Sequence, residues 1–275
     1  MQNPSEVRYR LYATLLDAWQ DYLDTPQIYD RYWGLSARPP HTLEEFWIKQ
    51  HASLIDRINR VPFTSEAASK GTAFNAVIDT LITGRPDEKV PMSKVLDDNG
   101  KPLAVQAELD GFTFQFPYRI CMEFALYYKG AIPQVRVSAI LSTMYGNVEL
   151  YGYIDELMPL SIHDIKYTRR YSAGKFKRHS QHLVYPYCLI HNGSNVPTFE
   201  YNVAEESKSG NWHTYTETYV FDPGRDIPVL RERCEGLIEF AIQNRQFITD
   251  RKIFGGENPD GYMGQPIDIN RLIPK

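Results

Sequence analysis

The sequence contains few cysteines, and they cannot build a disulfide framework. Only three of its 275 residues are cysteine, namely Cys121, Cys188 and Cys234. Three widely spaced thiols cannot all pair within one chain, and their spacing matches no zinc site. We therefore expect buried free thiols in a reducing compartment, which favours a cytoplasmic location.

Long apolar runs are also missing. No stretch of about 18 consecutive apolar residues occurs, so the sequence predicts no membrane-spanning helix and no membrane partner. Residues 1–6 lack a basic segment followed by an apolar one, so we expect no secretory signal. With 43% hydrophobic and 23% charged residues, the composition is typical of a soluble globular protein.

An excess of basic charge is the third absence. The formal net charge is −4 at pH 7. A protein that coats nucleic acid with its whole surface is usually basic. Any contact with DNA must therefore come from a local patch, which favours a confined groove over a histone-like mode of binding.

The length suits one large domain, 1–275, that buries about three quarters of its unfolded surface. Within it we distinguish an N-terminal helical region, 1–62, and a core region, 63–195. A third region, 196–275, contains late strands, a helix and an irregular tail. No internal repeat is present.

Hydrophobic periodicity predicts an α/β fold with a central mixed β-sheet and helices on its faces. Helical spacing predicts helices at about 7–24, 43–59, 65–83, 112–129, 179–191 and 227–245. Runs rich in β-branched and aromatic residues predict strands over 134–141, 148–157, 161–167, 198–203 and 212–221. The short gap over 158–160 favours an antiparallel hairpin, and the turn at 97–100 predicts another.

Two predicted strands carry acids, and the second also carries a lysine. Side chains alternate along a strand, so Asp164 and Lys166 project to the same face. Hydrolysis of a phosphodiester needs a polarised phosphate and an activated water, which Mg²⁺ held by carboxylates supplies. Asp155 and Asp164 could converge on one ion, with the carbonyl of Ile165 as a further ligand. Lys166 could orient the water or stabilise the phosphate in the transition state.

These residues belong to three motifs that follow one another closely in the chain. The motifs are Gly152-Tyr153-Ile154-Asp155, Asp164-Ile165-Lys166 and Gln181-His182-Leu183-Val184-Tyr185. With them the sequence resembles the PD-(D/E)XK nuclease superfamily, specifically its RecB-like exonuclease branch. The resemblance covers about 71–190 and implies a restriction-endonuclease-like core.

The resemblance implies a Mg²⁺- or Mn²⁺-dependent DNA exonuclease of DNA repair, recombination or phage DNA processing. By this resemblance, Asp155 and Asp164 would bind the metal. Lys166 would position the attacking water or stabilise the phosphate. Gln181 and Tyr185, which share one face of a helix, would orient the lysine and contact the substrate backbone. The expected partners are DNA and either a second copy of the chain or a recombination protein. Some members hold an iron–sulfur cluster with four cysteines, and the three scattered cysteines here imply that it is absent.

The chain departs from the branch in an upstream helix. In members of the branch, a glycine of this helix is followed four residues later by a metal-binding His or Glu. In this chain, Gly71 is followed four residues later by Asn75. An amide oxygen is the weaker ligand, and Glu123 could take its place. The alternative is a weakened nuclease fold that acts as a nucleic-acid-binding or assembly module. A restriction-like endonuclease ranks lower, because no separate recognition domain is visible.

Each feature also has a structural explanation. Asp164 and Lys166 could form a surface ion pair on an edge strand, and Gln181 and Tyr185 could belong to an exposed polar helix face. Gly71 costs about 1 kcal/mol within a helix, so either close packing or a ligand requires it, or a helix crossing tolerates it.

Other polar and aromatic residues leave two readings open. A basic loop could line the approach of a phosphate backbone or simply be solvated; it contains Arg169, Arg170, Lys175, Lys177 and Arg178. His163, His179 and His182 are expected to be neighbours of the site rather than ligands. Trp212 and the many tyrosines could stack on bases, but packing is the expected role for most of them.

Overall fold

The computed structural model describes residues 6–255. Its centre is a six-stranded mixed β-sheet with strand order β1-β6-β7-β8-β9, to which β5 adds by pairing with β6. This confirms the predicted mixed α/β fold. The strands of this sheet are β1 (Val7–Tyr12), β5 (Ile132–Thr143), β6 (Gly146–Met158), β7 (Ser161–Thr168), β8 (Thr198–Glu206) and β9 (Trp212–Val220).

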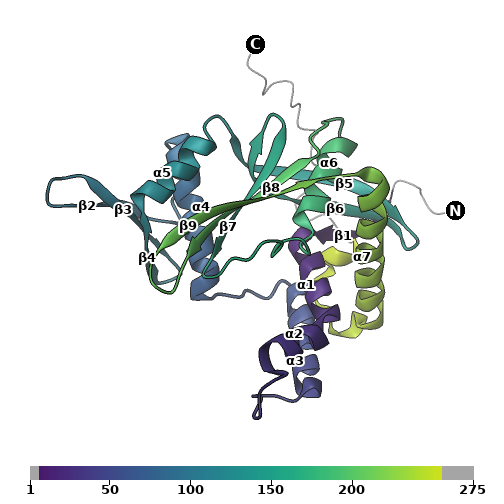
Figure 1. Cartoon of the computed structure of the whole chain (residues 1–275). Helices are drawn as coiled ribbons and strands as arrows, with labels where there is room; N and C mark the ends of the chain where they lie inside the picture. The colour runs from purple at the N-terminus through teal and green to yellow at the C-terminus, as the bar shows by residue number, and fades with distance from the viewer. Residues whose placement is uncertain (1–5, 256–275) are drawn as a thin grey trace.

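Helices cover both faces of the sheet (Figure 1). One face packs against α1 (Ala13–Leu23), α6 (Gln181–His191) and α7 (Pro223–Gln243), and it holds one hydrophobic cluster. The other face packs against α4 (Glu66–Thr83) and α5 (Tyr118–Tyr127) and holds a second cluster. Strand alternation explains the separation, because Tyr201 and Val203 of β8 point to the first cluster and Ala204 points to the second.

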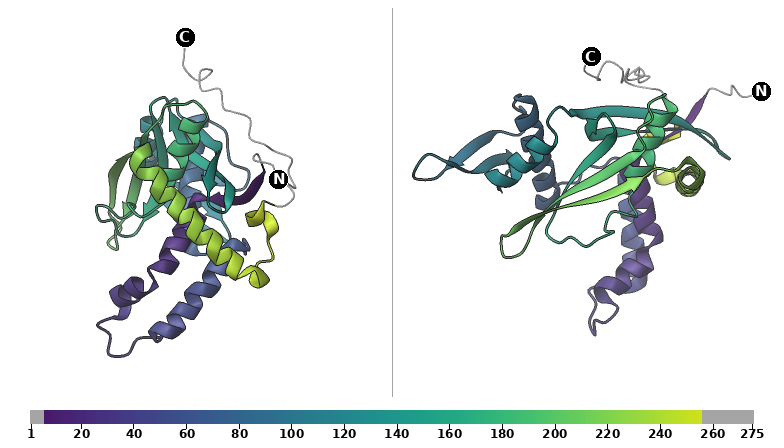
Figure 2. Two further views of the ribbon diagram at one scale, coloured as in Figure 1. Left: turned by 90° about the vertical axis from the view of Figure 1, so that its right-hand side faces the viewer. Right: turned by 45° about the horizontal axis from the view of Figure 1, so that its top comes forward.

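Two parts of the chain extend beyond this body, as Figure 2 shows. The helices α2 (Thr25–Trp33) and α3 (Leu43–Ile58) form an arm with the end of α1. A three-stranded antiparallel sheet projects in another direction; its strands are β2 (Met92–Leu96), β3 (Pro102–Leu109) and β4 (Phe112–Pro117). Short 3₁₀ helices, η1 (Arg245–Phe247) and η2 (Arg251–Phe254), follow α7.

Strand β6 changes its partner along one edge. Its other edge pairs with β5 from Gly146 to Leu157. On the changing edge, residues Asn147 to Tyr151 pair with β1, whereas Glu156 to Met158 pair with β7. No strand pairs with residues 152–155 on this side within residues 6–255. The sheet therefore forks beside the Gly-x-Ile-Asp motif.

Two predicted helices begin as strands. Val7–Tyr12 is β1, and Phe112–Pro117 is β4, so the helical predictions for these stretches are wrong. Both have alternating patterns; in β4, for example, Phe114 and Phe116 are buried while Thr113 and Gln115 are exposed. Strand pairing with β6 and β3 overrides the apparent helical spacing.

Local signals position α3 and α4 as predicted, whereas α2 falls outside the predicted helices. The Thr42 side chain accepts from the Glu45 N–H, and Glu45 in turn accepts from the Thr42 N–H, so a capping box starts α3. Ser65 caps α4, which ends at Gly84 with φ of 68°. The helix α7 starts four residues earlier than predicted, because the Asp222 side chain caps it by accepting from the Arg225 N–H. The predicted irregular tail, residues 256–275, lies outside the described residues.

No helix among residues 6–255 combines the length and apolar character needed to cross a bilayer.

Candidate active site

The fork in the sheet positions the two acids of the motifs. Asp155 lies on β6 just before pairing with β7 begins, and Asp164 lies on β7 just after the paired stretch. Where the strands separate, the Ile165 N–H donates to Asp155 Oδ2 at 2.9 Å. The Ile165 N–H thus bonds a carboxylate in place of the backbone carbonyl of a neighbouring strand. This hydrogen bond holds Asp155 next to the Asp-x-Lys motif.

Asp164, Lys166 and Gln181 form one buried network. Asp164 is 2% exposed, and its Oδ2 lies 2.6 Å from Lys166 Nζ. Lys166 Nζ also donates to Gln181 Oε1 at 2.8 Å, while Gln181 Nε2 donates to Asp164 Oδ1. The surface ion-pair explanation is wrong, because β7 lies inside the sheet between β6 and β8. The exposed-face explanation is also wrong, since Gln181 and Tyr185 are each 5% exposed.

Tyr185 contacts β6 through the glycine of the first motif. A Cβ atom built at Gly152 would lie 2.5 Å from Tyr185 Cε1. No real Cβ could occupy that position without moving the ring. This close approach explains why β6 has a glycine in its interior at position 152.

Asn75 faces the site from α4. Its Nδ2 donates to Asp155 Oδ2 at 3.1 Å, and its Oδ1 is buried without a hydrogen-bond partner among the described residues. The position predicted for a supporting residue therefore does reach Asp155. Gly71, one turn earlier, has no packing role, because a Cβ atom there would meet no atom within 4 Å. The close-packing explanation for Gly71 is wrong.

Two acids near the site were missed by the sequence analysis. Asp79 lies one turn after Asn75 on α4, and its carboxyl group contacts that of Glu156, the neighbour of Asp155. Glu156 is fully buried, and neither of its carboxylate oxygens has a donor among the described residues. The four-residue spacing of Asn75 and Asp79 was the available signal. Nothing in the sequence distinguishes a buried Glu156 from a surface glutamate.

The electrostatics of the site favour a cation. Burial first, and then the charge of Asp164, raise the pKa of Asp155 to about 8, although Lys166 acts in the opposite direction. Burial also raises the pKa of Asp164, against the effect of Lys166. The pKa of Lys166 is raised, because Asp164 and Asp155 outweigh its desolvation. Lys166 alone does not offset two buried carboxylates, so bound positive charge would stabilise their ionised forms.

The donor set suits Mg²⁺ or Mn²⁺ only with additional ligands. Within residues 6–255, no three His, Cys, Asp or Glu side chains are arranged to hold a metal. Mg²⁺ commonly takes one or two carboxylates and completes its octahedron with water and substrate phosphate. Asp155, Asp164, the Ile165 carbonyl and the free Oδ1 of Asn75 are all oxygen donors of this kind. These residues fit such an ion, and their metal-binding role stays a prediction.

The three histidines near the motifs have protein partners. His163 contacts Ser161 and Asn202, on the face of β7 opposite Asp164. His182 contacts the Tyr201 hydroxyl. His179 Nδ1 lies 3.6 Å from Asp17 Oδ2.

The basic loop that follows β7 is exposed, but three of its cations are engaged. Arg169 bonds the Tyr167 side chain. Lys175 Nζ donates to Thr168 Oγ1 at 2.6 Å and to the Arg170 carbonyl at 2.8 Å. Arg178 pairs with Asp24 at the end of α1. The DNA-binding role of the loop stays a prediction. Trp212 packs against Phe74 and Phe116, as expected for a structural residue.

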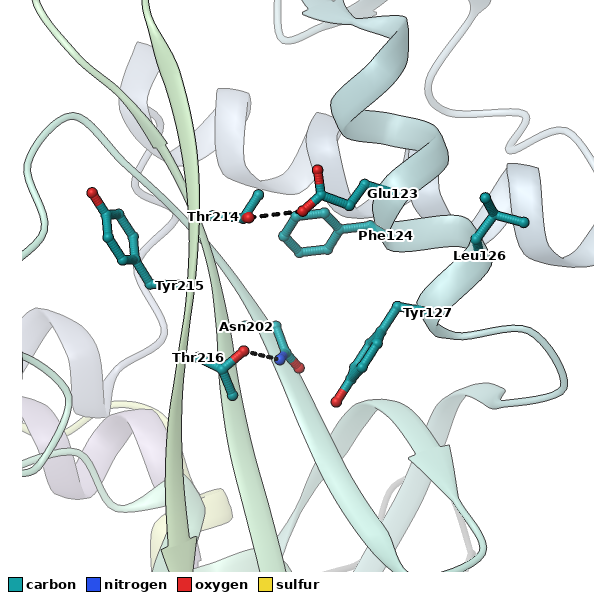
Figure 3. A pocket seen from close by; sticks show the side chains of 8 residues that line it. All are labelled: Glu123, Phe124, Leu126, Tyr127, Asn202, Thr214, Tyr215 and Thr216. Carbon is teal, nitrogen blue, oxygen red and sulfur yellow. Dashed lines mark hydrogen bonds between the residues drawn. The ribbon is translucent and has the colours of Figure 1, made fainter.

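Glu123 does not replace the missing ligand. It bonds Thr214 Oγ1 at 2.8 Å and lies beside a pocket of about 490 Å³ between α5 and strands β8 and β9 (Figure 3). Asn202 lines the same pocket and bonds Thr216. None of the residues of the three motifs lines it. The predicted substitution of Glu123 for a site ligand is therefore wrong.

Comparisons with known proteins give only distant likenesses. No family model and no curated protein matches the chain. One similar solved structure is that of the Eubacterium rectale protein named "Putative exonuclease", with a TM-score of 0.38 and 12% identity over 94% of this chain and 91% of that one. Another is the crystal structure of SSO0001, with a TM-score of 0.37 and 9% identity over 84% of this chain and 78% of that one. Similarities of this size assign neither a family nor an activity.

Proposed function

We propose that the protein is a Mg²⁺- or Mn²⁺-dependent deoxyribonuclease that hydrolyses phosphodiester bonds. One observation carries the proposal: at the fork of the sheet, Asp155 lies against the backbone of Ile165, beside the buried ion pair of Asp164 and Lys166. Two acids, an adjacent lysine and a gap between strands are the groups that metal-assisted phosphate chemistry requires.

Each residue has a distinct part in this proposal. Asp155, Asp164 and the Ile165 carbonyl would hold the ion, and Asn75 Oδ1 could complete their set. When bound, the ion would withdraw charge from the phosphate and favour ionisation of a water molecule. Lys166 would place its ammonium against the developing negative charge. Gln181 fixes Lys166 by its hydrogen bond, and Tyr185 closes the site behind Gly152.

Asn75 motivates a second candidate, a nucleic-acid-binding or assembly module with little catalysis. Its amide donates to Asp155, as it would to a carboxylate without metal. An amide is a weaker ligand than the acid or imidazole of the resembled branch, so metal affinity could fall below the useful range. This candidate predicts DNA binding that neither needs metal nor leads to cleavage.

Cleavage of linear DNA with Mg²⁺ or Mn²⁺ tests the proposal. Asp164→Asn and Lys166→Met should each reduce the rate by about a hundredfold or more, because the first weakens a metal ligand and the second removes the positive charge at the reacting phosphate. Asp98→Asn, in an exposed turn, provides the matched control. Without cleavage, and with no metal-dependent rise in melting temperature, the nuclease proposal fails.

The DNA form distinguishes exonuclease from endonuclease. We expect digestion of linear molecules from an end and no cutting of closed circles. Cuts in circular DNA at defined sequences would favour the restriction-like alternative.

A further inference from the structure

A second cavity opens directly beside the candidate active site. It has a volume of about 370 Å³, and Asp155, Gln181 and Tyr185 form part of its wall. The remaining wall comes from the end of β1, the start of α1, residue Arg60 and strand β6. Nothing in the proposed chemistry uses those residues, so the cavity needs an explanation of its own.

Arg60 is held at this cavity in an unusual conformation. Its φ of 54° lies in the left-handed region, which residues other than glycine rarely adopt. Its Nη2 donates to the Tyr151 hydroxyl at 2.7 Å, and its guanidinium lies 5.7 Å from the centre of the Tyr12 ring. Asp250 lies 3.4 Å from its Nε, and the side chain is still 33% exposed. The guanidinium is thus both fixed and accessible.

Aromatic rings lead from Arg60 to the acids. Tyr151, Tyr153 and Asp155 alternate along β6, so they project from the same face at intervals of about 6.6 Å. Tyr153 is 54% exposed, although it sits in a strand of the central sheet. The rings of Tyr12 and Tyr151 lie 5.7 Å apart. An exposed ring between a fixed arginine and a carboxylate is arranged for a flat ligand with negative charge.

We infer that this cavity binds an unpaired nucleotide of single-stranded DNA next to the scissile phosphodiester, which rests on the proposed nuclease function. Tyrosine rings stack on any base, and the Arg60 guanidinium takes a phosphate. The bases of an intact duplex are already stacked, so they cannot present a face to Tyr153. A volume of about 370 Å³ suits a small ligand rather than a helix.

Binding measured without divalent metal tests the inference independently of cleavage. A fluorescent oligothymidylate and a blunt duplex of equal length are the two probes, followed by anisotropy. The single strand should bind at least about tenfold more tightly than the duplex, and Arg60→Gln and Tyr153→Leu should each remove most of that difference. Tyr153→Phe keeps the ring and should retain binding. Arg57→Gln, in the last turn of the preceding helix α3 and outside the cavity wall, is the control.

The results separate the two proposals. Equal affinity for both probes overturns the inference, and so do Arg60→Gln and Tyr153→Leu variants that bind like the parent. Cleavage of DNA without preference for single strands overturns the inference and leaves the nuclease proposal intact. Tight single-strand binding without any cleavage overturns the nuclease proposal alone. Because Tyr153 is exposed, thermal melting of its variants should match the parent and exclude misfolding.

Discussion

Gly152 and Tyr185 fit together because one of them lacks a Cβ atom. The tyrosine ring occupies the space where that atom would lie, 2.5 Å from Cε1. Two motifs that are separate in the sequence are therefore one packing unit, in which α6 closes over the fork of β6.

The first prediction follows from this contact. Gly152→Ala should displace the Tyr185 ring and reduce the free energy of unfolding by about 1–3 kcal/mol, the usual cost of overpacking. Urea denaturation measures it. The double variant Gly152→Ala with Tyr185→Leu should recover part of the loss, because the smaller side chain frees the space. Equal losses in the single and double variants would show that the contact is not the cause.

Gly71 leads to the opposite prediction. A Cβ atom there meets nothing within 4 Å, so Gly71→Ala should stabilise the protein by about 1 kcal/mol through helix propensity. Thermal or urea unfolding measures the gain. If the glycine exists to admit DNA, cleavage of DNA should fall in the same variant. A variant that is neither more stable nor less active would leave the glycine without an explanation.

The short motifs correctly predicted the arrangement of site residues that are close together in the sequence. Asp164 and Lys166 share a face because strands alternate, and the structure places both on that face, 2.6 Å apart. Sequence patterns could not show that β6 changes partner, because that requires β1 to pair with residues far along the chain. For the same reason the sequence did not single out Arg60, because only the fold brings the turn after α3 to β6.

The sequence also could not predict which polar side chains are buried. Glu156 and Asp79 look like ordinary helix and strand acids in the sequence, yet they contact each other inside the protein. Burial is a property of the assembled layers, so periodicity cannot reveal it for a single polar residue. The helical predictions for Val7–Tyr12 and Phe112–Pro117 were wrong for another reason. Both stretches carry the two-residue hydrophobic alternation of a strand, which the sequence does show.

His182 should make stability depend on pH. It is 8% exposed, and burial, followed by the charge of Arg233, lowers its pKa from 6.5 to about 3. Between these values the unfolded chain binds a proton that the folded protein does not. The free energy of unfolding should therefore fall by about 1.4 kcal/mol for each pH unit below 6.5 on account of this residue.

His182→Gln should remove that contribution. Urea unfolding of the parent and the variant from pH 8 to pH 5 gives the comparison. Loss of the ring stacked on Tyr219 should lower stability by a constant amount, so the two curves should run parallel above pH 7 and converge below it. Curves that stay parallel throughout would contradict a depressed histidine pKa.

Asn75→Asp tests whether the site holds a metal. The change replaces the donor to Asp155 with a third carboxylate, which should destabilise the metal-free protein by about 1–3 kcal/mol. With Mg²⁺ or Mn²⁺ the same carboxylate becomes a better ligand than the amide. A tenfold gain in affinity would then add about 1.4 kcal/mol of stability at saturating metal.

Melting temperatures across a metal titration provide the measurement, and Asn75→Ala is the matched control. The alanine variant loses the same hydrogen bond to Asp155 but gains no ligand, so metal should stabilise it no more than the parent. A steeper response in Asn75→Asp alone would place the ion against Asp155 by a measurement that does not depend on cleavage. If both variants respond alike, residue 75 does not reach the ion. If metal also fails to raise the melting temperature of the parent, the acids at the fork must serve DNA binding or assembly instead.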